Sequence, residues 1–254
     1  MVIAKKKIIE KIYDYVFRAK TKEEEWRAWE SLKKRDRDIN IVPREIKDTG
    51  ERKYYAWLVN EIQASIDGCP HNILEVGGTC ATAFYFRKIS PAIQCTLIDN
   101  NDTVLEYARW IFGTEPIKII KGDAKDLPVE DNKYDLVCSS GLIEHFDDGE
   151  IKKILSEMRR VIRPNGYVFI AVPNFFSPDL MRIWFKFGKG SERHITIKDM
   201  INLYIKELFP NDKLISHKHF DFVLGSNILP VYIEKGLGRL GLGFLNYIIV
   251  QKIC

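Results

Sequence analysis

The sequence has no C-x-x-C pair, although it contains five cysteines, at positions 69, 80, 95, 138 and 254. Structural zinc sites and dithiol redox sites usually take their thiols from such pairs. Small disulfide-framed domains are also much richer in cysteine. The sequence therefore indicates neither a zinc site nor a disulfide framework, and a reducing, cytoplasmic location is our expectation.

Long apolar runs and a strong excess of one charge are also missing. No stretch approaches the roughly 20 apolar residues that a membrane-spanning helix needs. The first residues, followed by Lys5, Lys6 and Lys7, do not form a signal peptide pattern. The 39 basic and 35 acidic residues give a net charge of only +4. We therefore expect no transmembrane segment and no nucleic-acid partner.

Apolar segments of two kinds alternate along the chain, and 46% of all residues are hydrophobic. Short β-branched runs predict buried strands, and segments with apolar residues at helical spacing lie between them. This alternation predicts parallel strands joined by helical crossovers. The predicted strands are 72–76, 94–99, 117–121, 133–140, 168–172, 214–223 and 245–250, and the main predicted helices are 52–66, 81–88, from 103, from 147, and 196–209. Capping-box patterns mark the helix starts at Thr103 and Asp147, and Pro164-Asn165-Gly166 is expected to end the helix that starts at Asp147.

Acidic residues and glycines stand at the ends of the first three strands. Glu75 is followed by Gly77 and Gly78, which permit a sharp turn and a close approach of a ligand to the backbone. Asp99 ends the second strand, where nucleotide-binding folds hold a ribose diol. Asp123 follows the third strand. Because parallel strands share one carboxyl edge, these groups predict a cofactor site at that edge.

Over residues 72–174, the predicted strands with their glycine turn and acidic residues resemble class I S-adenosylmethionine-dependent methyltransferases. The resemblance is closest to the ubiquinone-biosynthesis and sugar-modifying O-methyltransferases. The resemblance implies an α/β, Rossmann-like, seven-stranded, mostly parallel sheet with helices on both faces and an antiparallel edge. It also implies that S-adenosylmethionine is the cofactor, with its methionine part at Glu75, its ribose at Asp99 and its adenine at Asp123. The cofactor-binding residues expected on this basis are Glu75, Gly77, Gly78, Thr79, Asp99, Asn100, Asp123, Ala124 and Ser140.

The glycine turn departs from the family pattern, which usually has glycine at three alternate positions. Here those positions hold Gly77, Thr79 and Ala81. Thr79 adds a β-branched side chain where backbone and cofactor usually touch. This departure favours an alternative interpretation, a methyltransferase-like binding module that has lost catalysis.

Two additions flank the predicted sheet. Residues 1–70 read as an N-terminal helical extension, and residues 71–254 as the methyltransferase domain. Within that domain, residues from about 174 to 196 mix aromatic and basic side chains and follow the fifth strand at its carboxyl end. We interpret this segment as a cap over the substrate, and the alternative is a helix packed on the edge of the sheet.

Glu144 and His145 follow the fourth strand and are the candidate catalytic residues. A neutral hydroxyl is a poor nucleophile, and a histidine, with an unperturbed pKa of roughly 6.5, is a suitable base near neutral pH. Related O-methyltransferases with Glu-x-x-Glu-His bind a metal there, but the first position is Gly141 here, so no metal is expected. His194 would be the distant ligand in that alternative. A purely structural role for Glu144 and His145 also stays open.

The residues after the fourth strand exclude several classes of methyl acceptor. Ser139-Ser140-Gly141-Leu142 is not the Asn/Asp-Pro-Pro-aromatic motif typical of amino-methyltransferases of nucleic-acid bases. The second glutamate of protein arginine methyltransferases is also missing. We therefore predict methyl transfer to a hydroxyl of a small molecule or glycan. The alternatives are nitrogen or carbon methylation of a small metabolite, or the inactive binding module.

Overall fold

The structure is a computed structural model of the chain. It describes residues 13, 20–21, 23–24, 27, 31, 50–78, 81–112, 115–220 and 238–253. Most of the predicted N-terminal extension, Thr79 of the glycine turn, and the end of the predicted strand 214–223 therefore lie outside the described residues. The helix predicted over 52–66 is present as α3 (Gly50–Ser65).

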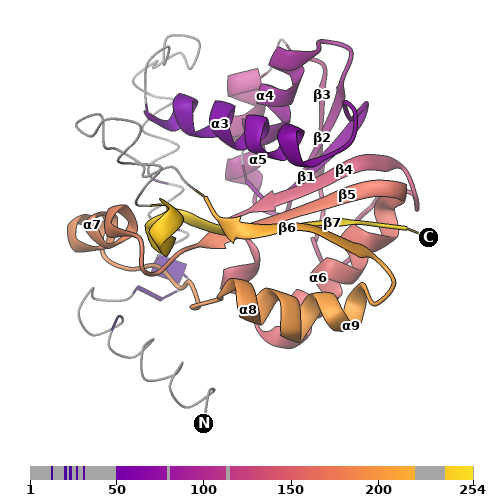
Figure 1. The fold of residues 1–254 in the computed structure, drawn as a ribbon. Helices are drawn as coiled ribbons and strands as arrows, with labels where there is room; N and C mark the ends of the chain where they lie inside the picture. The colour runs from indigo at the N-terminus through magenta and orange to yellow at the C-terminus, as the bar shows by residue number, and fades with distance from the viewer. Residues whose placement is uncertain are drawn as a thin grey trace.

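The described strands form one seven-stranded sheet, as predicted, in the order β3-β2-β1-β4-β5-β7-β6 (Figure 1). Neighbouring strands from β3 to β5 run parallel, and β7 runs antiparallel to both β5 and β6. The strands are β1 (Asn72–Val76), β2 (Gln94–Asp99), β3 (Ile117–Lys121), β4 (Tyr134–Ser140), β5 (Ile162–Pro173), β6 (Lys213–His219) and β7 (Leu245–Gln251).

Helices cover both faces of this sheet (Figure 1). One layer contains α3, α4 (Ala81–Ile89) and α5 (Asp102–Phe112), and the other contains α6 (Asp148–Val161), α8 (Ile197–Asp199) and α9 (Lys206–Leu208). A π-helical segment at Met200–Ile205 joins α8 to α9. The α7 helix (Pro178–Phe187) lies beyond the end of the sheet. Among the described residues, no helix combines the length and apolar character needed to cross a lipid bilayer.

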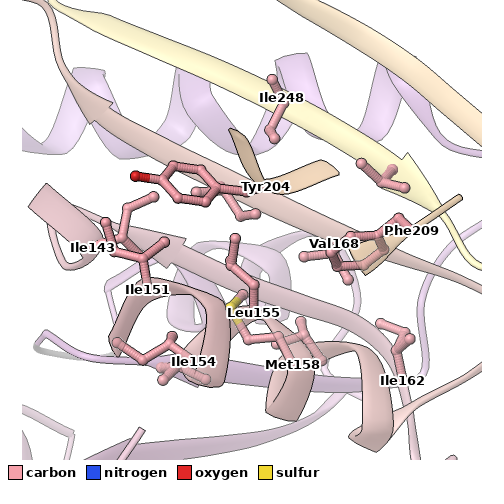
Figure 2. Packing of buried hydrophobic residues seen from close by; sticks show 14 of the residues in the cluster. Ile143, Ile151, Ile154, Leu155, Met158, Ile162, Val168, Tyr204, Phe209 and Ile248 are labelled. Atoms are coloured by element: carbon pink, nitrogen blue, oxygen red, sulfur yellow. The ribbon is translucent and has the colours of Figure 1, made fainter. Parts of the chain in front are cut away.

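Each face of the sheet has its own hydrophobic core. Successive residues of β4 point to opposite faces, so Leu136 and Cys138 join the core under α3, α4 and α5, whereas Val137 joins the core under α6. Figure 2 shows how Leu155 and Met158 of α6 face Tyr204 across the second core. Parallel strands buried on both faces explain why the sequence shows continuous apolar runs here. Cys95 and Cys138 are buried, as predicted for small hydrophobic side chains.

Two local predictions were wrong in detail. The capping box expected at Thr103 is not the start of α5, because the Asn101 side chain accepts hydrogen bonds from the backbone N–H groups of Thr103 (2.9 Å) and Val104 (3.3 Å). The fifth strand begins directly after α6, at Ile162, although the sequence predicted a turn at residues 164–166. Asn165 has a φ of 63°, so the backbone bends there within the strand.

The start of α6 is a complete capping box at Asp147 and Glu150, as the sequence predicted. Asp147 Oδ1 accepts from the backbone N–H of Glu150 (2.8 Å), and Glu150 Oε2 accepts from the backbone N–H of Asp147 (3.3 Å). Replacing Asp147 by alanine should lower the free energy of unfolding by about 1 kcal/mol, because it leaves a helix N–H without its acceptor. Urea unfolding measures this loss, and the exposed residue Lys153 of the same helix provides the control Lys153→Ala. An unchanged midpoint in Asp147→Ala would contradict the role of the cap.

Candidate functional site

The turn after β1 depends on two glycines with positive φ. Gly77 has a φ of 76° and Gly78 a φ of 101°, which side chains of L-residues rarely allow. A Cβ on Gly77 would lie 2.9 Å from Leu142 Cδ1, so a side chain would also collide with the turn after β4. The backbone N–H of Gly77 donates to the carbonyl oxygen of Ile98 (2.9 Å), which fixes the turn beside β2.

The carboxylate of Asp99 joins the end of β2 to this turn. Its Oδ2 accepts from the backbone N–H of Gly78 (2.9 Å), and its Oδ1 accepts from the backbone N–H of Asn101 (2.8 Å). Burial raises the pKa of Asp99, while the backbone N–H donors act in the opposite direction. A carboxylate has about four lone-pair sites, which is more than the three backbone donors of Gly78, Asn100 and Asn101 occupy, so Asp99 can still accept hydrogen bonds from a ligand.

Glu75 lies underneath the turn, with 6% of its surface exposed. Its Oε2 accepts from the backbone N–H of Ala83 in the first turn of α4 (2.9 Å). A carboxylate at this position satisfies a free N–H and complements the positive end of the helix dipole. The geometry therefore gives Glu75 a role in holding α4 against β1.

A cavity of about 470 Å³ opens at the carboxyl ends of β1, β2 and β3. Five of the predicted cofactor residues line it, namely Gly77, Asp99, Asn100, Asp123 and Ala124. Gly78 is not in the described lining, but its backbone N–H donates to Asp99, which is. Among the described residues, Glu75 and Ser140 are not part of the lining, and Ser140 is half-buried at the last position of β4. The complete described lining consists of Gly77, Ile98, Asp99, Asn100, Asn101, Gly122, Asp123, Ala124, Lys125, Leu142, Phe146 and Glu150.

One wall of this cavity was missed by the sequence analysis. Lys125 Nζ donates to Glu150 Oε1 (2.9 Å) and lies 5.6 Å from the centroid of the Phe146 ring. This hydrogen bond lowers the pKa of Glu150 and raises that of Lys125, so both groups stay charged near neutral pH. The capping box predicted at Asp147 was a signal for part of this wall, since it places Glu150 in the first turn of a helix at the same edge of the sheet.

The predicted catalytic pair lies on the turn between β4 and α6. Gly141 turns the chain with a φ of 75°, and a 3-10 turn, Ile143–His145, follows. Glu144 is 1% exposed, and its Oε1 is 3.9 Å from His145 Nε2. His145 Nδ1 is 2.9 Å from Ser191 Oγ. Leu142 and Phe146, on either side of the pair, line the cavity, whereas Glu144 and His145 are not part of its described lining.

Comparison with known proteins identifies the fold. A family profile described as a methyltransferase domain matches residues 74–170, which run from β1 into β5 and make up less than half of the chain. Over this segment, the match and the sheet topology support the class I S-adenosylmethionine-dependent methyltransferase family. A structure of a SAM-dependent methyltransferase from Aquifex aeolicus superposes with a TM-score of 0.57, covering 82% of this chain and 95% of that one, at 15% identity.

Two curated relatives match the central part of the chain. A fatty-acid O-methyltransferase of Mycolicibacterium smegmatis is 32% identical over 126 residues, which are 47% of this chain and 43% of that protein. A malonyl-[acyl-carrier protein] O-methyltransferase of Xylella fastidiosa is 29% identical over 121 residues, or 45% of this chain and 38% of that protein. The matched part of the chain thus spans less than half the length of these relatives.

The residues of the cavity fit the adenosyl part of S-adenosylmethionine. The volume falls in the range of roughly 300–1,000 Å³ typical of small-molecule sites. Asp99 and Asn100 provide polar groups, and Ala124, Leu142 and Phe146 provide apolar surface suited to a purine ring. The glycine turn leaves backbone accessible where a side chain would fill the space. Thr79, where the chain departs from the usual glycine pattern of the turn, lies outside the described residues.

The segment predicted as a cap has a buried side and an exposed side. Phe175, Leu180 and Trp184 form a small core of their own, against which Tyr13 packs with ring centroids 5.6 Å from Phe175 and 5.7 Å from Trp184. Two other aromatic residues of the cap, Phe176 and Phe185, are 46% and 71% exposed. Aromatic residues therefore serve both as anchor and as outer surface of the cap.

His194, considered as a distant metal ligand, is part of the buried side of the cap. It is 4% exposed, and its ring stacks on Phe175 with centroids 4.9 Å apart and an interplanar angle of 17°. Within the residue ranges that the structure describes, no group of three or more histidine, cysteine, aspartate or glutamate side chains is arranged to hold a metal ion. The geometry thus favours a packing role for His194.

Proposed function

We propose that the protein transfers a methyl group from S-adenosylmethionine to an oxygen atom of a small molecule, with a hydroxyl as the acceptor. The observation that carries this proposal is the cavity at the carboxyl ends of β1, β2 and β3, with Asp99 at its polar side. The two curated relatives, both named O-methyltransferases, support oxygen as the acceptor atom. Acceptor atoms of other kinds and a non-catalytic binding module are the alternatives that experiments must exclude.

In this proposal the residues of the cavity bind and orient the cofactor. Asp99 accepts hydrogen bonds from the ribose hydroxyls through the lone pairs left over by its backbone donors. Asp123 and Ala124 hold the adenine edge, and Leu142 and Phe146 pack against its faces. Gly77 allows the methionine part to approach the backbone of the turn. Bound S-adenosylmethionine supplies an electrophilic sulfonium methyl group.

In this proposal, the turn after β4 and the cap bind and activate the methyl acceptor. His145 removes the proton of the acceptor hydroxyl, because a neutral hydroxyl attacks poorly. Ser191 orients the imidazole through Nδ1, and the Glu144 carboxylate 3.9 Å from Nε2 stabilises the ring when it takes up a proton. Phe176 and Phe185 offer apolar surface to the rest of the acceptor.

Isothermal titration calorimetry with S-adenosylmethionine and S-adenosylhomocysteine should show binding of both to the folded protein. A turnover assay with a panel of hydroxyl, carboxylate and amine acceptors should then give methyl transfer to oxygen. Binding of cofactor without turnover on any acceptor class would support the binding module. Folded protein that binds neither compound, or transfer to nitrogen or carbon alone, would overturn the proposal.

A further inference from the structure

Arg193 connects the cap to the turn that carries the cavity wall. Its backbone N–H donates to the carbonyl oxygen of Glu144 (2.9 Å), and its guanidinium Nη1 donates to the carbonyl oxygen of Phe146 (2.6 Å). The second guanidinium nitrogen, Nη2, donates to Asp148 Oδ1 (2.8 Å) at the start of α6. One residue of the cap thus binds the turn and the start of α6 at three alternate residues.

The turn is also attached at other points. Gly141 N–H donates to the carbonyl oxygen of Ala171 before the turn, and the side chain of Ile143 is buried in the core shown in Figure 2. The Phe146 N–H donates to the carbonyl oxygen of Ile143 (3.2 Å), and after the turn Asp148 Oδ1 accepts from the hydroxyl of buried Tyr204 (2.9 Å). At Phe146 itself, the guanidinium of Arg193 binds the backbone carbonyl.

We propose that Arg193 is a positioning residue, which holds the backbone of Phe146 so that its ring forms the wall of the cofactor cavity. This inference rests on the proposed function, since its effect is measured through binding of S-adenosylmethionine. The Arg193–Asp148 ion pair is itself a weak stabiliser, because the two side chains are 34% and 58% exposed and solvent screens them. The planar guanidinium, which bridges the Phe146 carbonyl oxygen and the Asp148 carboxylate, carries the effect rather than charge alone.

The contacts of Ser191 and Arg193 link the candidate base to the wall of the cofactor cavity. Ser191 contacts His145, and Arg193 contacts Glu144 and Phe146, so the same short stretch of the cap touches both the candidate base and the cofactor wall. An acceptor that binds against the cap therefore acts on a segment that already shapes the cofactor cavity. The inference extends the site beyond the residues that line the cavity.

A double-mutant cycle on Arg193 and Phe146 tests this inference. Arg193→Ala should weaken binding of S-adenosylhomocysteine by about tenfold in calorimetry, in keeping with the loss of one charge-assisted hydrogen bond. Phe146→Ala removes the ring but keeps the carbonyl acceptor. If Arg193 acts through the ring, Arg193→Ala should have little further effect in the Phe146→Ala background.

Controls separate positioning from folding and from the proposed function. Arg182→Ala removes another arginine of the cap and should leave affinity unchanged, and Arg193→Lys, which keeps the charge without the planar fork, should reproduce most of the loss. If Arg193→Ala does not fold, Arg193→Lys takes its place in the double-mutant cycle with Phe146→Ala. Full affinity in the Arg193 variants, or effects that add to that of Phe146→Ala, would overturn the inference alone. Absence of binding by the unaltered protein would overturn the proposed function and this inference together.

Discussion

Replacing His145 by alanine should lower the turnover rate by about 10²–10⁴-fold, the usual contribution of a general base. The affinity for S-adenosylmethionine should stay nearly unchanged, because the described lining of the cavity includes Leu142 and Phe146 but not His145. In the proposed mechanism, Nδ1 donates to Ser191 Oγ, which lies 2.9 Å away, and Nε2 is the nitrogen that takes the proton. Steady-state kinetics with calorimetry on the same preparation measures both quantities.

A companion variant, together with a stability measurement, distinguishes the base from its alternatives. His194→Ala should alter the packing of the cap around Phe175 without reproducing the catalytic loss. If His145 were a metal ligand, turnover would instead depend on an added divalent cation, and His194→Ala would lower turnover as much as His145→Ala. A structural role would lower the unfolding temperature of His145→Ala while its folded fraction kept full specific activity. A stable His145→Ala protein with full turnover would exclude catalysis by His145.

The sheet could be predicted from sequence because its strands carry their own signal. Strands buried on both faces need continuous β-branched and apolar residues, and the crossovers between them need amphipathic helices. The glycine turn and Asp99 belong to local segments directly after strands, so their position at the carboxyl edge follows from chain order alone. The cavity brings five of these predicted residues together. Local sequence patterns predicted this part of the cavity and no more.

The other wall depends on contacts between segments distant in sequence, and no local pattern contains them. Lys125 follows β3, but it faces the cavity because Glu150 of α6 binds it. Phe146 lines the wall, and the cap residue Arg193, far away in the sequence, donates to its carbonyl oxygen. Within the cap itself, Phe175 is buried and the adjacent Phe176 is 46% exposed, so residue type gave no indication of which aromatic residue anchors the segment.

Replacing Asp99 by alanine should weaken binding of S-adenosylmethionine by about 10²-fold or more. The carboxylate is proposed to accept two hydroxyl hydrogen bonds, and hydrogen bonds to a charged group are worth about 1.5–3 kcal/mol each. The substitution also removes the acceptors of the Gly78 and Asn101 N–H groups, which loosens the glycine turn. Calorimetry measures the loss of affinity. Thermal unfolding without ligand measures how much stability the protein loses when the glycine turn is loosened.

The matched control is Asp102→Ala, three residues further along the same edge. Asp102 is 68% exposed and pairs with Lys121 Nζ at 2.6 Å, so its removal should change neither binding nor stability by much. An Asp99→Ala protein that binds the cofactor as tightly as the Asp102→Ala control would remove Asp99 from the site and, with it, the main support for the position of the ribose.

The pH dependence of binding provides an independent test of the same carboxylate. Burial raises the pKa of Asp99 above its ordinary value of 3.8. Ribose hydroxyls donate to the ionised form, so acidification should begin to weaken cofactor binding at a higher pH than an exposed aspartate would require. Asp99→Asn cannot ionise and should bind weakly at every pH, with the acid-dependent fall of the unaltered protein abolished. If Asp99→Asn instead kept that fall, another group would be responsible, and the carboxylate of Asp99 would not be the ribose acceptor.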